Sequence, residues 1–106
     1  MSTYVLIASE DPLEHAERFY ALALQLRDAG HTVTLFLVQN AVLGARAARA
    51  RTALPTLLEA SVTILADEFS LRERGIAAID LRDGIHSAPL DVLTDLLARG
   101  HKALWN

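Results

Sequence analysis

The sequence predicts a three-layer α/β/α fold around a mainly parallel sheet, in one domain that spans residues 1–106. Short apolar runs alternate along the chain with segments of helical pattern, at the spacing of β-α-β units. Within the first two runs, polar residues are few, which is typical of strands that are covered on both faces. A chain of 106 residues removes roughly two-thirds of its unfolded surface from water, which supports one core and no second domain.

The first crossover joins the predicted strands 3–9 and 33–38 through one helix. Asp11 can cap this helix, and Pro12 suits its first turn. Gly30 supplies the left-handed residue that ends it. The predicted helix therefore fills the whole interval between the two strands.

The second half of the chain continues the alternation. Its predicted elements, in order, are a loop, a short alanine-rich helix and a helix near Pro55 within 39–60, a strand over 61–66, a turn of helix that begins at Glu68, a weak strand over 76–81, a loop "GIHS" that ends in the candidate cap Ser87, a helix over 89–100 and a final strand in "KALWN".

Composition excludes several classes of function. The net charge of -3 argues against a general polyanion-binding protein, so we expect no direct contact with nucleic acid. The absence of cysteine excludes disulfides, thiolate metal sites and cysteine-based catalysis. The N-terminal stretch has no basic region and only a short apolar run, so we expect neither a signal peptide nor a membrane span and place the chain in the cytoplasm. Because 52% of the residues are hydrophobic, we expect an oligomer.

Polar residues follow the predicted strands and define one candidate site. The loops after parallel strands gather along one edge of a sheet. This edge would collect Glu10, Asp11, Gln39, Asn40, Asp67, Glu68, His86 and Ser87.

Two interpretations compete for the acidic part of this edge. Asp67, Glu68 and His86 could supply a general acid and base, since a carboxylate can tune an imidazole for proton transfer. We favour the alternative, in which Asp67 caps the helix that begins at Glu68. The adjacent amides Gln39 and Asn40 fit a turn, and they also suit hydrogen bonding to a ligand or to a partner's backbone.

The remaining charged residues give weaker signals. The four histidines show no metal-ligand spacing, and no phosphate-cradling glycine loop is present, so we expect neither a metal nor a cofactor. The arginines Arg46, Arg49 and Arg51 form a basic cluster, for which a solvated helix face is the simpler interpretation and docking to an acidic partner the functional one.

Three stretches together resemble the DsrE/DsrF/DsrH group of sulfur-relay proteins, and especially its DsrH (TusB-like) branch. "LFLVQNAV" is similar to the strand that enters a Gln-Asp-Gly-Val-like loop, with Asn40-Ala41 in place of the Asp-Gly pair. "VTILADEFSLRERGI" resembles the next strand and a helical turn that ends in Arg-Gly, and "LLARGHKALWN" resembles the tryptophan-terminated tail of the DsrH branch.

This resemblance implies a five-stranded sheet and assembly into trimers or hexamers of small subunits that pass persulfide sulfur between cysteines. Such complexes serve 2-thiouridine formation on transfer RNA or oxidative sulfur metabolism. In the DsrE-like branch the sulfur-carrying cysteine lies seven residues before the arginine of the Arg-Gly pair. Counting back from Arg74 places Asp67 at that position, and a carboxylate cannot hold a persulfide.

Three hypotheses follow. The leading one is a non-catalytic accessory subunit that supports a cysteine-bearing DsrE/DsrF-like relative, with Gln39, Asn40, Asp67 and Glu68 at the shared edge. The alternative is a stand-alone homo-oligomer that binds a small ligand through Asn40, Asp67, Arg74 and His86. An acid/base enzyme that uses His86 and Asp67 ranks last.

Overall fold

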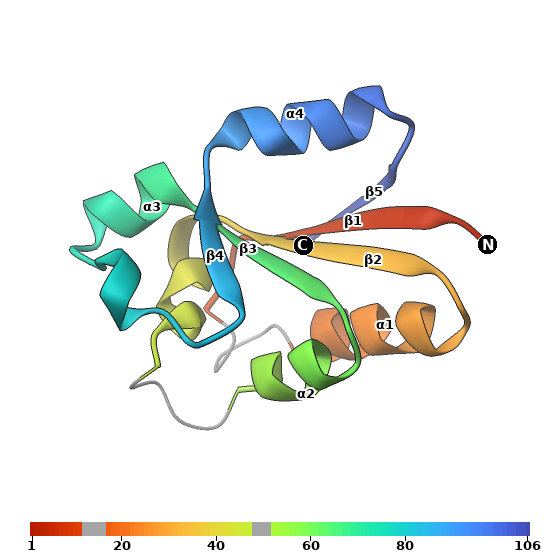
Figure 1. Cartoon of the computed structure of the whole chain (residues 1–106), viewed down its shortest axis with the longest axis horizontal. Coiled ribbons are helices and arrows are strands. Elements are labelled where there is room, and N and C mark those ends of the chain that lie inside the picture. Colours follow the sequence, from red (N-terminus) through yellow and green to blue (C-terminus); the bar gives the residue numbers. More distant parts are fainter. Residues whose placement is uncertain (12–16, 48–51) are drawn as a thin grey trace.

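A computed structural model of the chain describes residues 1–11, 17–47 and 52–106. Its strands are β1 (Thr3–Ala8), β2 (Thr32–Leu37), β3 (Thr63–Asp67), β4 (Ile85–Ala88) and β5 (Lys102–Trp105). They form one sheet in the order β4-β3-β2-β1-β5, and every neighbouring pair is parallel (Figure 1). The predicted parallel sheet and the number of its strands are therefore confirmed.

Helices lie on both faces of this sheet. The α-helices are α1 (Glu17–Asp28), α2 (Leu54–Glu59), α3 (Glu68–Glu73) and α4 (Leu90–Ala98), and two 3-10 helices, η1 (Gln39–Ala45) and η2 (Ala78–Asp80), join them. In Figure 1, α1 and α2 lie below the sheet and α4 lies above it, which confirms the three-layer α/β/α architecture. The segments η1, α3 and η2 lie at the carboxyl end of the strands.

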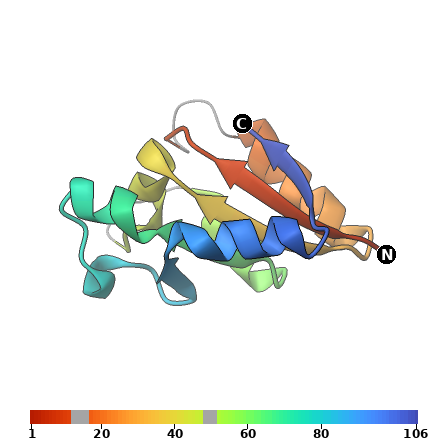
Figure 2. The ribbon, with the colours of Figure 1, turned by 90° about the horizontal axis from the view of Figure 1, so that it is seen from above.

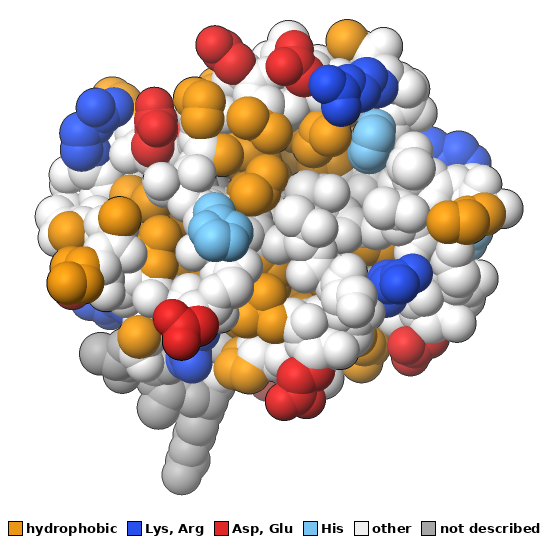
Figure 3. All heavy atoms as spheres, viewed as in Figure 1, with side chains coloured by type: hydrophobic (Ala, Val, Ile, Leu, Met, Phe, Trp, Pro, Cys, Tyr) orange, Lys and Arg blue, Asp and Glu red, His pale blue; other side chains and the backbone are white. Residues whose placement is uncertain are grey.

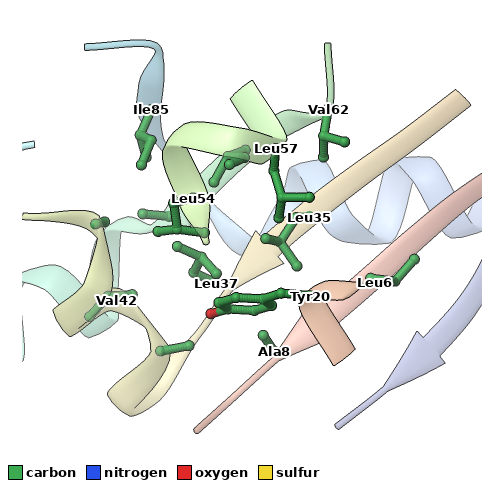
Figure 4. Close-up of a cluster of buried hydrophobic side chains, with 14 of the residues drawn as sticks. Leu6, Ala8, Tyr20, Leu35, Leu37, Val42, Leu54, Leu57, Val62 and Ile85 are labelled. Carbon is green, nitrogen blue, oxygen red and sulfur yellow. The ribbon is translucent and has the colours of Figure 1, made fainter. Parts of the chain in front are cut away.

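The core has a larger and a smaller part because alternate residues of each strand point to opposite faces. The larger part faces α1 and α2 and includes Leu6, Ala8, Leu35, Leu37, Leu54 and Leu57 (Figure 4). Ile64 of β3 belongs to it as well. The smaller part faces α4 and consists of Val5, Ile7, Phe36, Val38, Ala88 and Leu93. Among the described helices α4 alone covers the second face of the sheet, and Figure 2 shows the edge strand β5 beside α4 rather than beneath it.

Tyr20 of α1 brings a hydroxyl group into the larger core. Its side chain is 1% exposed, and its oxygen has no hydrogen-bond partner among the described residues. Burial, and to a smaller extent the negative charge of Asp11, raises the pKa of the Tyr20 hydroxyl well above its usual range. The folded protein therefore keeps this group protonated.

Glycines end three of the helices, as the sequence predicted for Gly30. In α1, α3 and α4 the glycine after the helix has a φ of 93°, 66° and 88°, respectively. The backbone N–H of each glycine and of the residue after it donates to carbonyls of the last turn, for example Gly30 to Arg27 and His31 to Leu26. These bonds satisfy carbonyls that the helix itself leaves unpaired.

Three predictions in the segment 76–88 are wrong. The expected strand over 76–81 is instead the 3-10 helix η2, and the expected loop "GIHS" is the edge strand β4. The Asp80 carboxylate accepts a hydrogen bond of 3.1 Å from the backbone N–H of Ala77, a local bond that competes with strand pairing. Ser87 pairs with Ala66 across β4 and β3, so it cannot cap α4, whose N-cap is Pro89.

Other expectations fall partly outside the described residues. The expected start of the first helix at Pro12 lies there, and α1 is described from Glu17 onward. The alanine-rich helix expected within 39–60 also lies partly outside the described residues. The loop expected at Gln39 is instead the start of the 3-10 helix η1. Among the described residues, no helix is long and apolar enough to span a membrane.

Candidate functional site

The carboxyl ends of β2 and β3 bring three of the predicted edge residues together, Gln39, Asn40 and Asp67. Gln39 and Asn40 open η1 directly after β2, and Asp67 ends β3 where α3 begins. Since β2 and β3 are adjacent and parallel, with Leu37 paired to Ala66, the two turns meet at the same edge. The contacts between η1 and α3 then fix how these side chains lie.

Asp67 is the N-cap of α3, which confirms the cap interpretation. Its backbone is extended, with φ -61° and ψ 121°, as an N-cap requires. Its Oδ2 atom accepts hydrogen bonds from the Ser70 backbone N–H at 3.0 Å and from the Ser70 hydroxyl at 2.7 Å. The side chain is only 6% exposed. Asp67 is therefore bound within the protein and anchors α3 to the end of β3.

Gln39 is linked to this cap through Ser70. The backbone N–H of Gln39 donates to the Ser70 oxygen at 2.9 Å, while the same hydroxyl donates to Asp67. Gln39 has a φ of 51°, a left-handed conformation that is uncommon for a residue with a side chain. Such backbone strain persists only where surrounding contacts hold it, and it is concentrated at binding and catalytic sites.

Asn40 and Arg74 form a second link between η1 and α3. The Asn40 Oδ1 atom accepts hydrogen bonds from Nε and Nη2 of Arg74 at 3.2 and 3.0 Å. Arg74 Nη1 also donates to the Ser70 carbonyl at 3.2 Å and lies 3.7 Å from Oε1 of Glu73. Asn40 and Arg74, expected at the site as ligand contacts, therefore contact each other.

A hollow of about 260 Å³ lies beside these links. Its lining residues are Val38, Gln39, Asp67, Phe69, Ser70, Glu73, Leu90 and Trp105. Three large apolar side chains at this hollow are exposed to solvent: Phe69 by 59%, Leu90 by 54% and Trp105 by 70%. In Figure 2 the elements that carry them, α3, α4 and β5, surround the carboxyl ends of β1 and β2.

Trp105 is exposed because of its position in the sheet. It pairs with Ile7, whose side chain belongs to the part of the core that faces α4, and parallel partners point to the same face. However, β5 is the outermost strand on that side and α4 does not extend over it (Figure 2). Hydrophobic side chains are also visible at the surface over α4 and at the α3 end of the molecule in Figure 3.

The other predicted residues lie apart from this hollow. His86 is exposed within β4 and pairs with Leu65, which lies two residues before Asp67 in β3. No hydrogen bond between described residues joins His86 to Asp67. Glu68 and Ser87 line a separate hollow of about 280 Å³ with Arg72. Neither Glu10 nor Asp11, after β1, is among the residues that line the Asp67 hollow.

The arginine cluster is only partly described. Arg46 is half-buried, its Nε donates to the Leu43 carbonyl at 3.3 Å, and its backbone forms an isolated antiparallel bridge with Leu81. It therefore does not lie on a solvated helix face. Arg49 and Arg51 lie outside the described residues. In the described parts of the chain, no group of three or more His, Asp or Glu side chains could hold a metal ion.

Sequence reasoning missed the residues that shape the hollow. Phe69, Ser70 and Glu73 lie in a stretch whose acids alone suggest a site, and Trp105 belongs to a tail that carries only a family resemblance. One available signal is that the chain's single tryptophan stands in a short C-terminal strand, where an exposed aromatic residue suggests a contact surface.

The fold is shared with solved structures of three other proteins. No family model and no curated protein matches the sequence. The ychN protein from E. coli aligns over 100% of both chains with a TM-score of 0.88 and 23% identity. MTH1491 from Methanobacterium thermoautotrophicum aligns over 100% of both chains with a TM-score of 0.87 and 15% identity. BT1422 from Bacteroides thetaiotaomicron aligns over 97% of this chain and 94% of its own chain with a TM-score of 0.72 and 22% identity. The latter two are described as proteins of unknown function, and at these identities the likeness shows the fold alone.

Proposed function

We propose that this chain is a non-catalytic accessory subunit of a cytoplasmic sulfur-relay complex, in which it supports a cysteine-bearing relative. The observation that carries the proposal is that Asp67 is buried and serves as a helix cap. This residue stands where the family resemblance puts the sulfur-carrying cysteine, yet it is 6% exposed and bound to Ser70 as a helix cap. The chain has no cysteine elsewhere to carry sulfur.

The surface beside Asp67 supports a binding role. Phe69, Leu90 and Trp105 expose apolar area around one hollow, and apolar area grouped in this way is characteristic of interaction sites. Docking of the relative at this edge would cover these side chains, and Arg46, Arg49 and Arg51 would supply a second, charged contact. The complex would serve 2-thiouridine formation on transfer RNA or sulfur oxidation.

Native mass spectrometry of the tagged chain, purified from its own cytoplasm, tests the proposal. We expect a subunit of similar size that has a cysteine after its third strand. Replacing Phe69 and Trp105 together by alanine should release that subunit, whereas Leu97→Ala, an exposed apolar change on α4 outside the hollow's lining, should not. If only copies of this chain are recovered, the accessory role is wrong.

The hollow itself favours a second candidate, a homo-oligomer that binds a small ligand. Its volume of about 260 Å³ is close to the lower limit of known ligand sites, and its lining combines apolar side chains with a few polar ones. A ligand that binds the folded state raises the melting temperature, so a thermal-shift screen of metabolites tests this candidate.

A further inference from the structure

The hollow beside Asp67 has a one-sided charge. Two carboxylates, those of Asp67 and Glu73, contribute to its lining, and none of the described residues that line it is Lys, Arg or His. Arg74 lies beside it: its Nη1 is 3.7 Å from Oε1 of Glu73 and donates to the Ser70 carbonyl, while its Nε and Nη2 donate to Oδ1 of Asn40. Glu73 is 54% exposed, so it remains accessible to a ligand.

Asp67 has an oxygen atom that no described residue uses. Both of its hydrogen bonds are accepted by Oδ2, which leaves Oδ1 without a described donor. The side chain is more than nine-tenths buried and lines the hollow. Oδ1 does not belong to the fully buried side-chain atoms that lack a partner. A carboxylate oxygen at the hollow can accept a hydrogen bond, and a charged donor gives the stronger bond.

Two of the apolar residues in the lining, Phe69 and Trp105, are aromatic. Phe69 and Trp105 come from different elements, and the one aromatic pair found among the described residues is Tyr4 with His31, so the two rings do not stack on each other. The face of an aromatic ring carries partial negative charge and attracts organic cations. The carboxylates and the rings therefore favour the same kind of ligand.

We infer that this hollow binds an organic cation, a guanidinium or alkylammonium group. The volume of about 260 Å³ is room for roughly eight or nine waters, enough for such a group and too small for a large cofactor. Two carboxylates without further ligands are a poor site for a metal ion, whereas cations with apolar substituents gain from Phe69 and Trp105 as well. The inference deepens the proposed function and rests on it, because it names the chemistry that the docking edge recognises.

Trp105 is the chain's only tryptophan, so its fluorescence reports directly on the hollow. The purified chain is titrated with choline and, in parallel, with 3,3-dimethylbutan-1-ol, a neutral molecule of similar shape. Blocked arginine and lysine amides are titrated in separate arms. We expect a saturable change in emission with at least one cation, no saturation with the neutral analogue, and weaker binding at high salt.

Two variants locate the binding within the hollow. Glu73→Gln and Phe69→Leu should each weaken cation binding about two- to fivefold, as expected for a partly exposed charge or ring. Asp95→Asn and Leu97→Ala, which alter exposed α4 residues outside the hollow's lining, should leave it unchanged. Circular dichroism verifies that all four variants are folded.

The outcomes separate the sources and the hypotheses. Binding of the arginine or lysine amide alone identifies a partner's side chain, and binding of choline alone identifies a free amine. Equal binding of the neutral analogue overturns the inference. Emission that changes with protein concentration and not with added cations also overturns it, and that result assigns the hollow to a contact with a second copy of the chain. Cation binding without a co-purifying subunit overturns the proposed function alone, and a co-purifying subunit without cation binding overturns this inference alone.

Discussion

Asp67→Ala removes the group on which the α3 end of the site depends. The substitution eliminates the N-cap bond to the Ser70 backbone, which contributes about 1 kcal/mol. It also eliminates the hydrogen bond from the Ser70 hydroxyl to a charged oxygen, which contributes about 1.5 kcal/mol more. We therefore expect the free energy of unfolding to fall by about 2–3 kcal/mol.

Urea denaturation followed by circular dichroism measures this change. For a domain of this size the urea midpoint should fall by about 1–2 M with an unchanged slope. Asp67→Asn keeps a cap acceptor and loses only the charge, so it should cost about 1 kcal/mol or less. Glu68→Ala, at the exposed neighbouring position, should cost about 0.5 kcal/mol or less.

A double-mutant cycle with Ser70→Ala isolates the pair. Both bonds join Asp67 to Ser70, and the Ser70→Ala variant keeps only the bond from the backbone N–H, so a coupling energy of about 1 kcal/mol is expected. If Asp67→Ala destabilises the protein no more than Glu68→Ala does, then Asp67 does not anchor α3. Its assignment as a structural residue, at the position where the resemblance puts the sulfur-carrying cysteine, would then be wrong.

Further predictions concern the core and one turn. Tyr20→Phe removes a buried hydroxyl that lacks a described partner, and it should raise the free energy of unfolding by about 1 kcal/mol in urea titrations near pH 7. The folded state raises the pKa of the Tyr20 hydroxyl. The stability linked to its protonated form is therefore complete below the unfolded pKa of about 10 and is lost as the pH rises above that value. When the titrations are repeated at higher pH, the Tyr20→Phe variant should lose less stability than the wild type. Gly84→Ala should destabilise more than Gly100→Ala in the same assay, since both have a positive φ but only a Cβ at 84 would meet Leu58, at 3.3 Å; equal losses would show that this contact relaxes freely.

The sequence by itself determined the order of the main elements. The apolar runs at β1 and β2 and the Schellman-type glycine after α1 fixed the first crossover, and Asp67 followed by a helical turn predicted the cap that the structure shows. These features are local, because a strand covered on both faces, a left-handed glycine and an N-cap each depend on a few consecutive residues. The parallel sheet then followed from the spacing of the crossovers.

Only the tertiary structure decided the edge strand β4 and the composition of the site. His86 and Ser87 are exposed and carry no strand pattern of their own, and they become a strand because β3 offers a free edge for pairing. Phe69 and Trp105 meet at one hollow because the start of α3 and the end of β5, which are distant in sequence, lie near the same part of the sheet, and because α4 leaves β5 uncovered. Pairing across a sheet edge and exposure beside a helix depend on the positions of other elements, so no local pattern in the sequence carries them.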